Sequence, residues 1–146
     1  NIRLHLIGKL QTNKVKFAVK LFDFIHSLDS EKLARKIADE QIKQNKKIKL
    51  FIQVNIGNEE QKSGLSINKL IDFYKYCKDL NLNIIGLMCI PPADEDPEKY
   101  FMKINILNKK LNLTELSMGM SSDYLKAVKY SSSYLRIGSS IFGKRV

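Results

Sequence analysis

Cysteine, arginine and long apolar runs are all scarce in this chain of 146 residues. Cys77 and Cys89 are too few and too isolated for a disulfide framework or a zinc site, so we expect both to be buried. No apolar run approaches the ~20 residues that cross a bilayer, and no signal peptide opens the chain. We therefore expect a soluble, cytoplasmic protein with no metal site.

The basic balance of the chain does not indicate a nucleic-acid partner. Lysine and arginine total 25 against 15 acids, for a net charge of +10, but only four of the basic residues are arginines. The lysines recur along the chain with acids between them, and no stretch alternates aromatic residues with arginines as single-strand binders require. This distribution is typical of a solvated surface.

The apolar residues predict a single α/β domain. They make up 44% of the chain, which is ample for one core. Short β-rich runs alternate with amphipathic helical stretches, and most of these runs are continuously apolar, as in parallel strands covered on both faces. The expected strands cover residues 4–7, 22–26, 48–55, 84–89, 114–118 and 134–137.

Helical periodicity marks three stretches between these strands. The expected apolar stripes are Leu33, Ala34, Ile37, Ala38 and Ile42, then Leu70, Ile71, Tyr74 and Cys77, then Tyr100, Phe101, Ile104, Leu107 and Leu111. Ser66 precedes the second stripe and is the expected N-cap residue of that helix.

The most informative feature lies near the C-terminus, where two successive strands each end at glycine and serine. Gly119 and Ser121 follow the fifth expected strand, and Gly138 and Ser139 follow the sixth. A strand that stops at such residues before a helix leaves N–H groups and hydroxyls free for an anion. Because the carboxyl ends of neighbouring parallel strands meet at one edge, both turns are expected to hold one phosphate.

The position of this pair favours a TIM-type (β/α)8 barrel, because barrels often bind phosphate in the loops after their last two strands. The chain supplies about six βα units, whereas a full barrel takes eight units and about 250 residues. The first residue is Asn1, almost directly before the first expected strand. We therefore expect that two leading βα units precede this sequence.

Several motifs, taken together and in this order, resemble the pyridoxal phosphate homeostasis protein family, also called the YggS or PROSC family. They are His5-Leu6-Ile7-Gly8-Lys9-Leu10-Gln11-Thr12-Asn13-Lys14, Gln53-Val54-Asn55, Lys62-Ser63-Gly64, Gly86-Leu87-Met88 before Ile90-Pro91, Gly119-Met120-Ser121-Ser122-Asp123 and Arg136-Ile137-Gly138-Ser139-Ser140-Ile141-Phe142-Gly143. The resemblance implies that residues 1–146 are a single barrel domain like the N-terminal domain of alanine racemase, without its first two βα units, and that it binds pyridoxal 5′-phosphate.

Members of this family bind the cofactor aldehyde through a lysine on the first barrel strand, which the resemblance places upstream of Asn1. No lysine in the chain replaces it. Lys49 is the nearest to a strand, but it lies at the strand's start and beside Lys46 and Lys47. A Schiff-base lysine needs a lowered pKa, which an exposed position does not provide.

Seven residues are the candidate cofactor contacts: Gly119, Ser121, Gly138 and Ser139 at the phosphate, Arg136 beside the cofactor, and His5 and Asn55 near the ring. Arg136 is expected either on the phosphate or at the pyridine nitrogen, where it would keep the nitrogen unprotonated and weaken the ring as an electron sink. A structural role remains open for His5, because no neighbouring carboxylate partners it.

We expect a monomeric, non-enzymatic protein of vitamin B6 homeostasis, which sequesters pyridoxal phosphate and delivers it to apo-enzymes. Two alternatives remain open. An amino-acid racemase would need a further acid or base on the opposite face of the ring, and a barrel enzyme for a phosphorylated sugar would need a carboxylate or histidine beside the phosphate. Asp123 is the only acid close in sequence, and a helix-capping role explains it.

Overall fold

The computed structural model describes residues 1–146 and contains one parallel sheet of six strands. The strands lie side by side in sequence order, and every neighbouring pair is parallel, so each connection crosses over to the next strand. They are β1 (His5–Leu6), β2 (Phe24–Leu28), β3 (Lys49–Gln53), β4 (Asn83–Met88), β5 (Glu115–Met120) and β6 (Tyr134–Arg136). All six predicted strands are present, with bounds that differ by a few residues.

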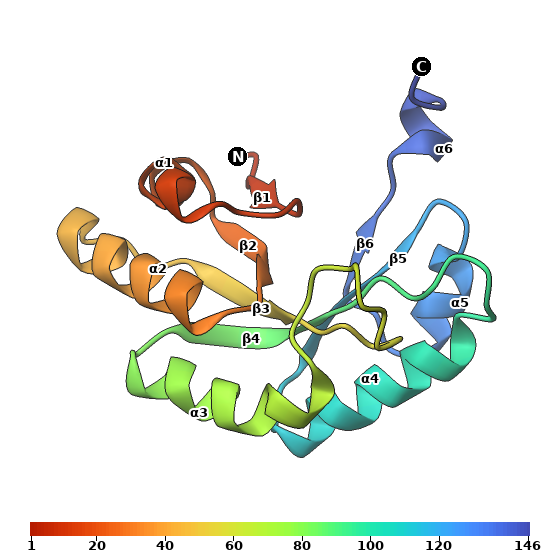
Figure 1. Ribbon diagram of the computed structural model, residues 1–146. Coiled ribbons are helices and arrows are strands. Elements are labelled where there is room, and N and C mark those ends of the chain that lie inside the picture. The colour runs from red at the N-terminus through yellow and green to blue at the C-terminus, as the bar shows by residue number, and fades with distance from the viewer.

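A helix follows each strand. The α-helices are α1 (Val15–Leu21), α2 (Glu31–Gln44), α3 (Leu70–Asp79), α4 (Glu98–Lys110), α5 (Tyr124–Lys129) and the short α6 (Ser139–Phe142), and the 3-10 turns are η1 (Thr12–Lys14) and η2 (Ile67–Lys69). The helices α1 to α5 lie on the convex side of the sheet, whereas α6 stands beyond the end of β6 (Figure 1).

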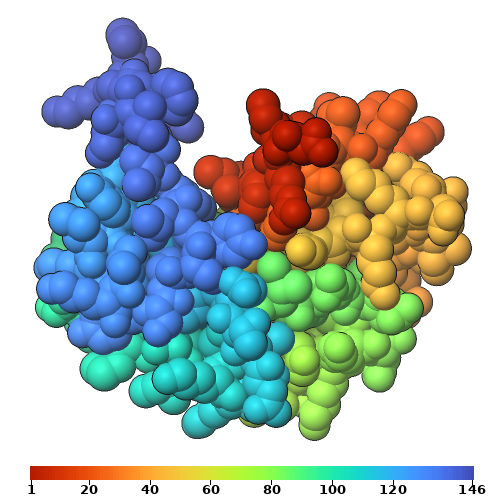
Figure 2. Space-filling view, turned by 180° about the vertical axis from the view of Figure 1, so that it is seen from behind, coloured from red at the N-terminus to blue at the C-terminus, as the bar shows by residue number.

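The sheet is strongly curled, so that its two edges approach each other across the concave side. The ring centroids of His5 on β1 and Tyr134 on β6 lie 5.6 Å apart, although these strands are at opposite ends of the strand order. Seen from behind, a notch separates the red N-terminal segment from the blue C-terminal segment (Figure 2). The molecule is thus a parallel half-barrel.

The main core lies between the sheet and its helices. Leu33, Ala34, Ile37 and Ala38 of α2 are buried there as predicted. Ile42 was expected in the same stripe, but it lies in the last turn of α2 and is 81% exposed.

The stripe of α3 is also only partly as predicted. Leu70 and Cys77 are buried, while Ile71 is 58% exposed and Phe73 takes the inward position. The phase of α3 differs because the chain first makes the turn η2. Ser66 is the N-cap residue of η2, and its side chain forms no capping bond; its backbone carbonyl instead accepts a hydrogen bond from Lys69 N–H at 3.0 Å. Ser66 is thus an N-cap residue, but of η2, whereas the N-cap residue of α3 is Lys69.

Asn108 joins α4 to the sheet and was not anticipated. Its side-chain oxygen accepts a hydrogen bond from Leu87 N–H at 3.1 Å, and its amide nitrogen donates to the carbonyls of Leu113 and Glu115 at 3.2 and 3.0 Å. The side chain is buried, so these bonds satisfy a polar group that would otherwise be costly in the core.

Both cysteines are free and buried, as predicted, and burial raises the pKa of each thiol to about 12. None of the helices combines the length and the apolar character that a membrane span requires. No cluster of three or more histidine, cysteine or acidic side chains is arranged to bind a metal ion.

Candidate functional site

The two glycine-serine turns face each other at the ends of β5 and β6. The backbone N–H of Ser140 donates a hydrogen bond to the Ser121 hydroxyl at 3.1 Å, which links the second turn to the first. Ser139 is the first residue of α6, so its N–H has no partner within that helix. Asp123 closes the first turn by accepting a bond from Met120 N–H at 2.7 Å. The Ser139 N–H and the hydroxyls of Ser121 and Ser139 thus belong to two turns that are joined to each other.

The two glycines are needed for different reasons. Gly119 has φ +98°, and a Cβ there would lie 2.7 Å from the Ala127 side chain and 2.9 Å from that of Leu135, so glycine allows α5 and β6 to pack against β5. A Cβ on Gly138 would meet no atom within 4 Å. Gly138 therefore borders open space.

Arg136 lies on β6 just before the second turn, and it is buried without an acidic partner. Its Nη1 donates to the Ser117 hydroxyl at 2.7 Å, and its Nη2 donates to the Cys89 carbonyl at 2.9 Å. It takes part in none of the ion pairs of the structure. Burial lowers the pKa of this guanidinium, although a nearby Asp123 opposes the shift. Both direct hydrogen-bond acceptors of the guanidinium are therefore neutral.

A chain of hydrogen bonds continues from Arg136 across the concave face. The Ser117 hydroxyl on β5 lies 2.7 Å from Nδ1 of His26 on β2, and Nε2 of His26 lies 3.0 Å from Nδ1 of His5 on β1. The guanidinium can only donate, so Ser117 accepts from it and has its own proton to give to His26. Every hydrogen-bonding group in this chain has a partner when Arg136 donates to Ser117, Ser117 donates to His26, and His26 donates to His5.

His26 stays neutral in this setting. Burial lowers its pKa from 6.5 to about 3, and the neighbouring His5 and Arg136 act in the same direction. Its ring also stacks on Phe51, with centroids 4.4 Å apart. His26 and Ser117 were not among the predicted site residues. The only sequence signal is a pair of polar residues, His26 and Ser27, inside an otherwise apolar strand.

His5 lies on the concave face, stacked on Phe24 with ring centroids 4.0 Å apart. Its partial burial lowers the pKa of the imidazole, while Asp23 opposes this shift. The partner of His5 is a second histidine, His26, and not a carboxylate. It is therefore connected to Arg136 through the hydrogen-bond chain.

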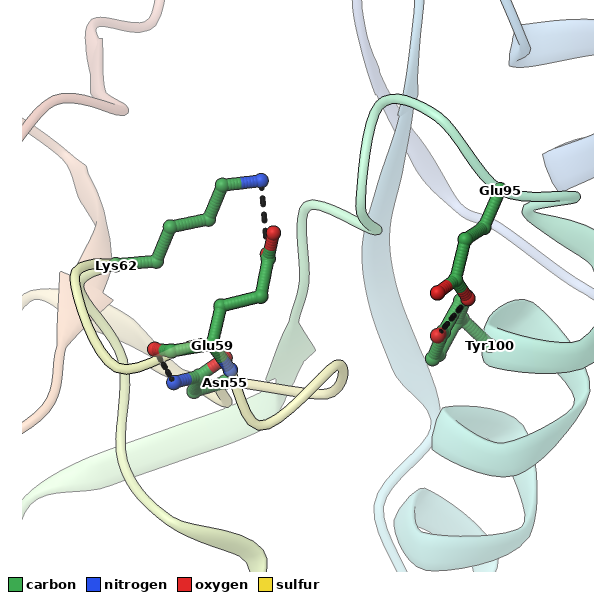
Figure 3. Close-up of polar contacts among 5 residues, drawn as sticks. All are labelled: Asn55, Glu59, Lys62, Glu95 and Tyr100. Atoms are coloured by element: carbon green, nitrogen blue, oxygen red, sulfur yellow. Dashed lines mark hydrogen bonds and ion pairs between the residues drawn. The ribbon is translucent and has the colours of Figure 1, made fainter.

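Asn55 lies in the loop after β3, and both ends of its amide are occupied. Its nitrogen donates to the Glu59 carbonyl at 2.7 Å, and its oxygen accepts from Glu59 N–H at 3.1 Å (Figure 3). Lys62 pairs with the Glu59 carboxylate at 2.9 Å, and Gly64 N–H donates to Asp29 at 3.1 Å. In this loop the Asn55 side chain orders the backbone. Lys62 and Gly64 belong to a turn whose polar groups are already bonded to Glu59 and Asp29.

The loop between β4 and α4 also makes a polar contact of its own. The Tyr100 hydroxyl donates to the Glu95 carboxylate (Figure 3). The same carboxylate also accepts from Lys99 at 2.7 Å. Lys49 lies at the opposite end of the sheet, as the first residue of β3, with its Nζ 5.3 Å from the centre of the Phe24 ring. Lys49 is thus remote from the carboxyl ends of the strands, where the two glycine-serine turns lie.

Comparison with known proteins assigns this arrangement to a family. The model of the alanine racemase N-terminal domain matches residues 2–146. The pyridoxal phosphate homeostasis protein of Aquifex aeolicus is 39% identical over 99% of this chain and 68% of its own length. The chain belongs to the pyridoxal phosphate homeostasis protein family. The homologue from Helicobacter pylori is 40% identical over 94% of the chain and 65% of its own length. The chain thus spans about two thirds of these family members.

A solved structure extends the assignment to the fold of the family. PipY of Synechococcus elongatus, determined with pyridoxal phosphate bound, superimposes with a TM-score of 0.89 at 33% identity, over 97% of this chain and 71% of PipY. Alanine racemase of Clostridium difficile is only 15% identical but has a TM-score of 0.72, so the fold is shared with this enzyme. The predicted α/β class and the family resemblance are both confirmed.

Proposed function

We propose that this chain binds pyridoxal 5′-phosphate, with the phosphate between the turns after β5 and β6 and the ring beside Arg136. The observation that carries this proposal is a buried guanidinium without an acidic hydrogen-bond partner, next to two turns that a hydrogen bond joins. A buried charge is costly unless it is paired, and an anionic ligand or a ring nitrogen supplies the missing acceptor. The names of the homologues and the cofactor in PipY support the same ligand.

The donors present fit a phosphate dianion. The N–H groups of Gly138 and Ser139 and the hydroxyls of Ser121 and Ser139 would hold its oxygens through charge-assisted bonds. The open space beside Gly138 leaves room for the ester. His5 would lie on the ring side of the site, where it is linked to Arg136 through His26 and Ser117. Asn55 would act indirectly, by ordering the loop after β3.

We infer a role in vitamin B6 homeostasis without catalytic turnover, in which a cytoplasmic monomer holds the cofactor and passes it to apo-enzymes. Pyridoxal phosphate acts as an electron sink when its ring nitrogen is protonated, and an arginine at that nitrogen keeps it unprotonated. Arg136 in that position would suit storage better than carbanion chemistry. The homologues are likewise named for homeostasis of the cofactor and not for a reaction.

We further infer that the half-barrel is part of a (β/α)8 barrel. Its edge strands β1 and β6 already approach across the concave side, and apolar residues next to β1 are exposed, with Ile2 at 90% and Leu4 at 47%. Two further units pairing with these edges would cover them. The family resemblance places the lysine that bonds the cofactor aldehyde in those units, and Lys49 does not replace it, because it lies at the opposite end of the sheet.

The binding proposal is tested by equilibrium dialysis of the protein against pyridoxal phosphate, with absorbance of the bound cofactor as the readout. Arg136→Ala and Ser139→Ala should each weaken retention, and Ser139→Ala should cost about 1–2 kcal/mol if one charge-assisted bond is lost. Unchanged affinity in both variants would refute the site. Incubation with alanine in deuterated water separates carrier from racemase, and we expect no exchange of the α-hydrogen.

A further inference from the structure

We propose that Ser117 and His26 are positioning residues, which fix the Arg136 guanidinium in the orientation that pyridoxal phosphate requires. This inference rests on the proposed function, because it assigns a cause to the placement of Arg136 in that site. Neither residue is expected to touch the cofactor. They act through the hydrogen-bond chain Arg136 to Ser117 to His26, whose members come from β6, β5 and β2.

The guanidinium is held on two sides. Ser117 accepts from Nη1 at 2.7 Å and the Cys89 carbonyl accepts from Nη2 at 2.9 Å, which uses two of the five N–H donors of arginine. The Cys89 contact is backbone and does not depend on side-chain identity. Ser117 is the only side chain that accepts a hydrogen bond from Arg136. Without its hydroxyl, the long side chain of Arg136 would regain rotational freedom in the neighbourhood of the ligand.

Ser117 works as an acceptor only if its own proton is taken up elsewhere. The residue is 0% exposed, so water does not accept this proton, and Nδ1 of His26 lies 2.7 Å away. A protonated His26 would instead donate to Ser117 and leave the hydroxyl proton buried without an acceptor. It would also place a second positive charge near Arg136. Neutral His26 therefore directs the lone pair of Ser117 toward the guanidinium.

His26 is itself held in place by packing as well as by hydrogen bonds. It is 1% exposed, stacks on Phe51, and uses Nε2 for its contact with His5. A rigid ring between two polar partners is a suitable support for a serine hydroxyl, whose rotation is otherwise free. The arrangement predicts that the two ring nitrogens contribute differently, since only Nδ1 faces Ser117.

A double-mutant cycle on the full chain tests this role. Dissociation constants for pyridoxal phosphate are measured for the wild type, Ser117→Ala, Arg136→Met and the double variant. Ser117→Ala should weaken binding about tenfold, as expected when a charged hydrogen bond is lost. In the Arg136→Met background the same change should have no further effect, because Ser117 acts only through Arg136. Equal losses in both backgrounds would overturn the proposal.

Conservative variants separate positioning from general damage to the fold. Ser117→Thr keeps the hydroxyl and should restore near wild-type affinity. His26→Asn keeps an acceptor close to the position of Nδ1 and should bind better than His26→Phe, which keeps only the stacking on Phe51. Thermal melting of each variant shows that it is folded. If Ser117→Ala and Ser117→Thr bind equally, or His26→Asn and His26→Phe do, the proposal is wrong.

A readout without cofactor distinguishes this inference from the proposed function. The side-chain Nε–H signal of Arg136 in ¹⁵N NMR should be single and slowly exchanging in the wild type and in Ser117→Thr, and broadened by exchange in Ser117→Ala. An unchanged signal in Ser117→Ala would show that Ser117 does not position Arg136. If the signal broadens in Ser117→Ala, the link between Ser117 and Arg136 is upheld. If the wild type nevertheless does not bind pyridoxal phosphate, only the proposed function is refuted.

Discussion

The Ser121 hydroxyl accepts a hydrogen bond from the backbone N–H of Ser140 at 3.1 Å, and this bond joins the ends of two neighbouring strands. Neither turn alone is a convincing anion site, because α6 is a single short helical turn and the first turn is closed internally by Asp123. The bond between Ser140 and Ser121 brings the donors of the two turns close to each other. The proposed binding of a phosphate ester depends on this pairing.

Replacing Ser121 should therefore weaken ligand binding more than replacing its neighbour. Ser121→Ala removes both a hydroxyl donor and the acceptor for Ser140 N–H, and we expect binding to weaken by roughly 1–2 kcal/mol. Ser122→Ala is the matched control, because Ser122 is exposed and its side chain forms no hydrogen bond. Calorimetric titration with pyridoxal phosphate measures both. Equal affinities in the two variants would contradict the role of Ser121.

Gly138→Val should abolish or greatly weaken binding while leaving the fold intact. A Cβ there would meet no protein atom within 4 Å, so we expect the valine side chain to clash with a bound phosphate and not with the protein. Urea unfolding should give a free energy within about 1 kcal/mol of the wild type, as is usual for exposed positions. If the variant still binds pyridoxal phosphate with wild-type affinity, the phosphate does not bind at this turn.

Gly119→Ala should have the opposite profile, with a large loss of stability. The methyl group would lie 2.7 Å from the Ala127 side chain, and φ of +98° strains any residue that has a Cβ. Overpacking and backbone strain each cost about 1–3 kcal/mol, so we expect a loss of at least 2 kcal/mol in the free energy of unfolding. Unfolding at the wild-type urea concentration would show that the contact relaxes without cost.

The neutral state of His26 makes stability depend on pH. The pKa is about 3 in the folded protein and 6.5 as a free group, so the unfolded chain binds a proton below pH 6.5 that the folded chain does not. The contribution of neutral His26 to the free energy of unfolding is therefore complete above pH 6.5. It decreases by up to about 4 kcal/mol as the pH falls toward 3. His5, whose pKa is also lowered by burial, contributes in the same direction.

Urea unfolding of the wild type and His26→Asn at pH 7 and pH 4 measures this effect. The asparagine variant has no proton to gain at this position, so the difference in stability between the two proteins should shrink at pH 4. A difference that is the same at both pH values would mean that His26 titrates normally in the folded state.

Ser27→Ala should leave the protein as stable as the wild type or stabilise it by up to about 1 kcal/mol. The Ser27 hydroxyl is buried and has no hydrogen-bond partner, and such a group costs free energy when it is taken out of water. Thermal unfolding of the two proteins gives the comparison. A clear loss of stability in the alanine variant would reveal a partner of this hydroxyl.

The sequence was sufficient to predict the six strands, because continuous apolar runs between amphipathic helices fit few structures other than buried parallel strands. It was also sufficient for the two facing turns, since neighbouring parallel strands end at the same edge. The helix faces were less predictable. Ile42 and Ile71 fit the apolar periodicity, but the end of α2 leaves the core and η2 shifts the phase of α3.

The hydrogen-bond chain behind Arg136 was not predictable in the same way. It depends on how far each strand is displaced along its neighbour and on how tightly the sheet curls, and neither follows from local sequence. His26 and Ser117 are 91 positions apart, yet their polar atoms lie 2.7 Å from each other. Likewise, nothing near Asn55 indicated that its amide would be used by Glu59 in the same loop.

A crystal structure of the chain grown with pyridoxal phosphate tests the central claim most directly. We predict phosphate oxygens within hydrogen-bond distance of the Ser121 hydroxyl and of the N–H groups of Gly138 and Ser139, with the pyridine ring directed toward Arg136. A phosphate bound among surface lysines, with the space between the two turns empty or filled by solvent, would contradict the account.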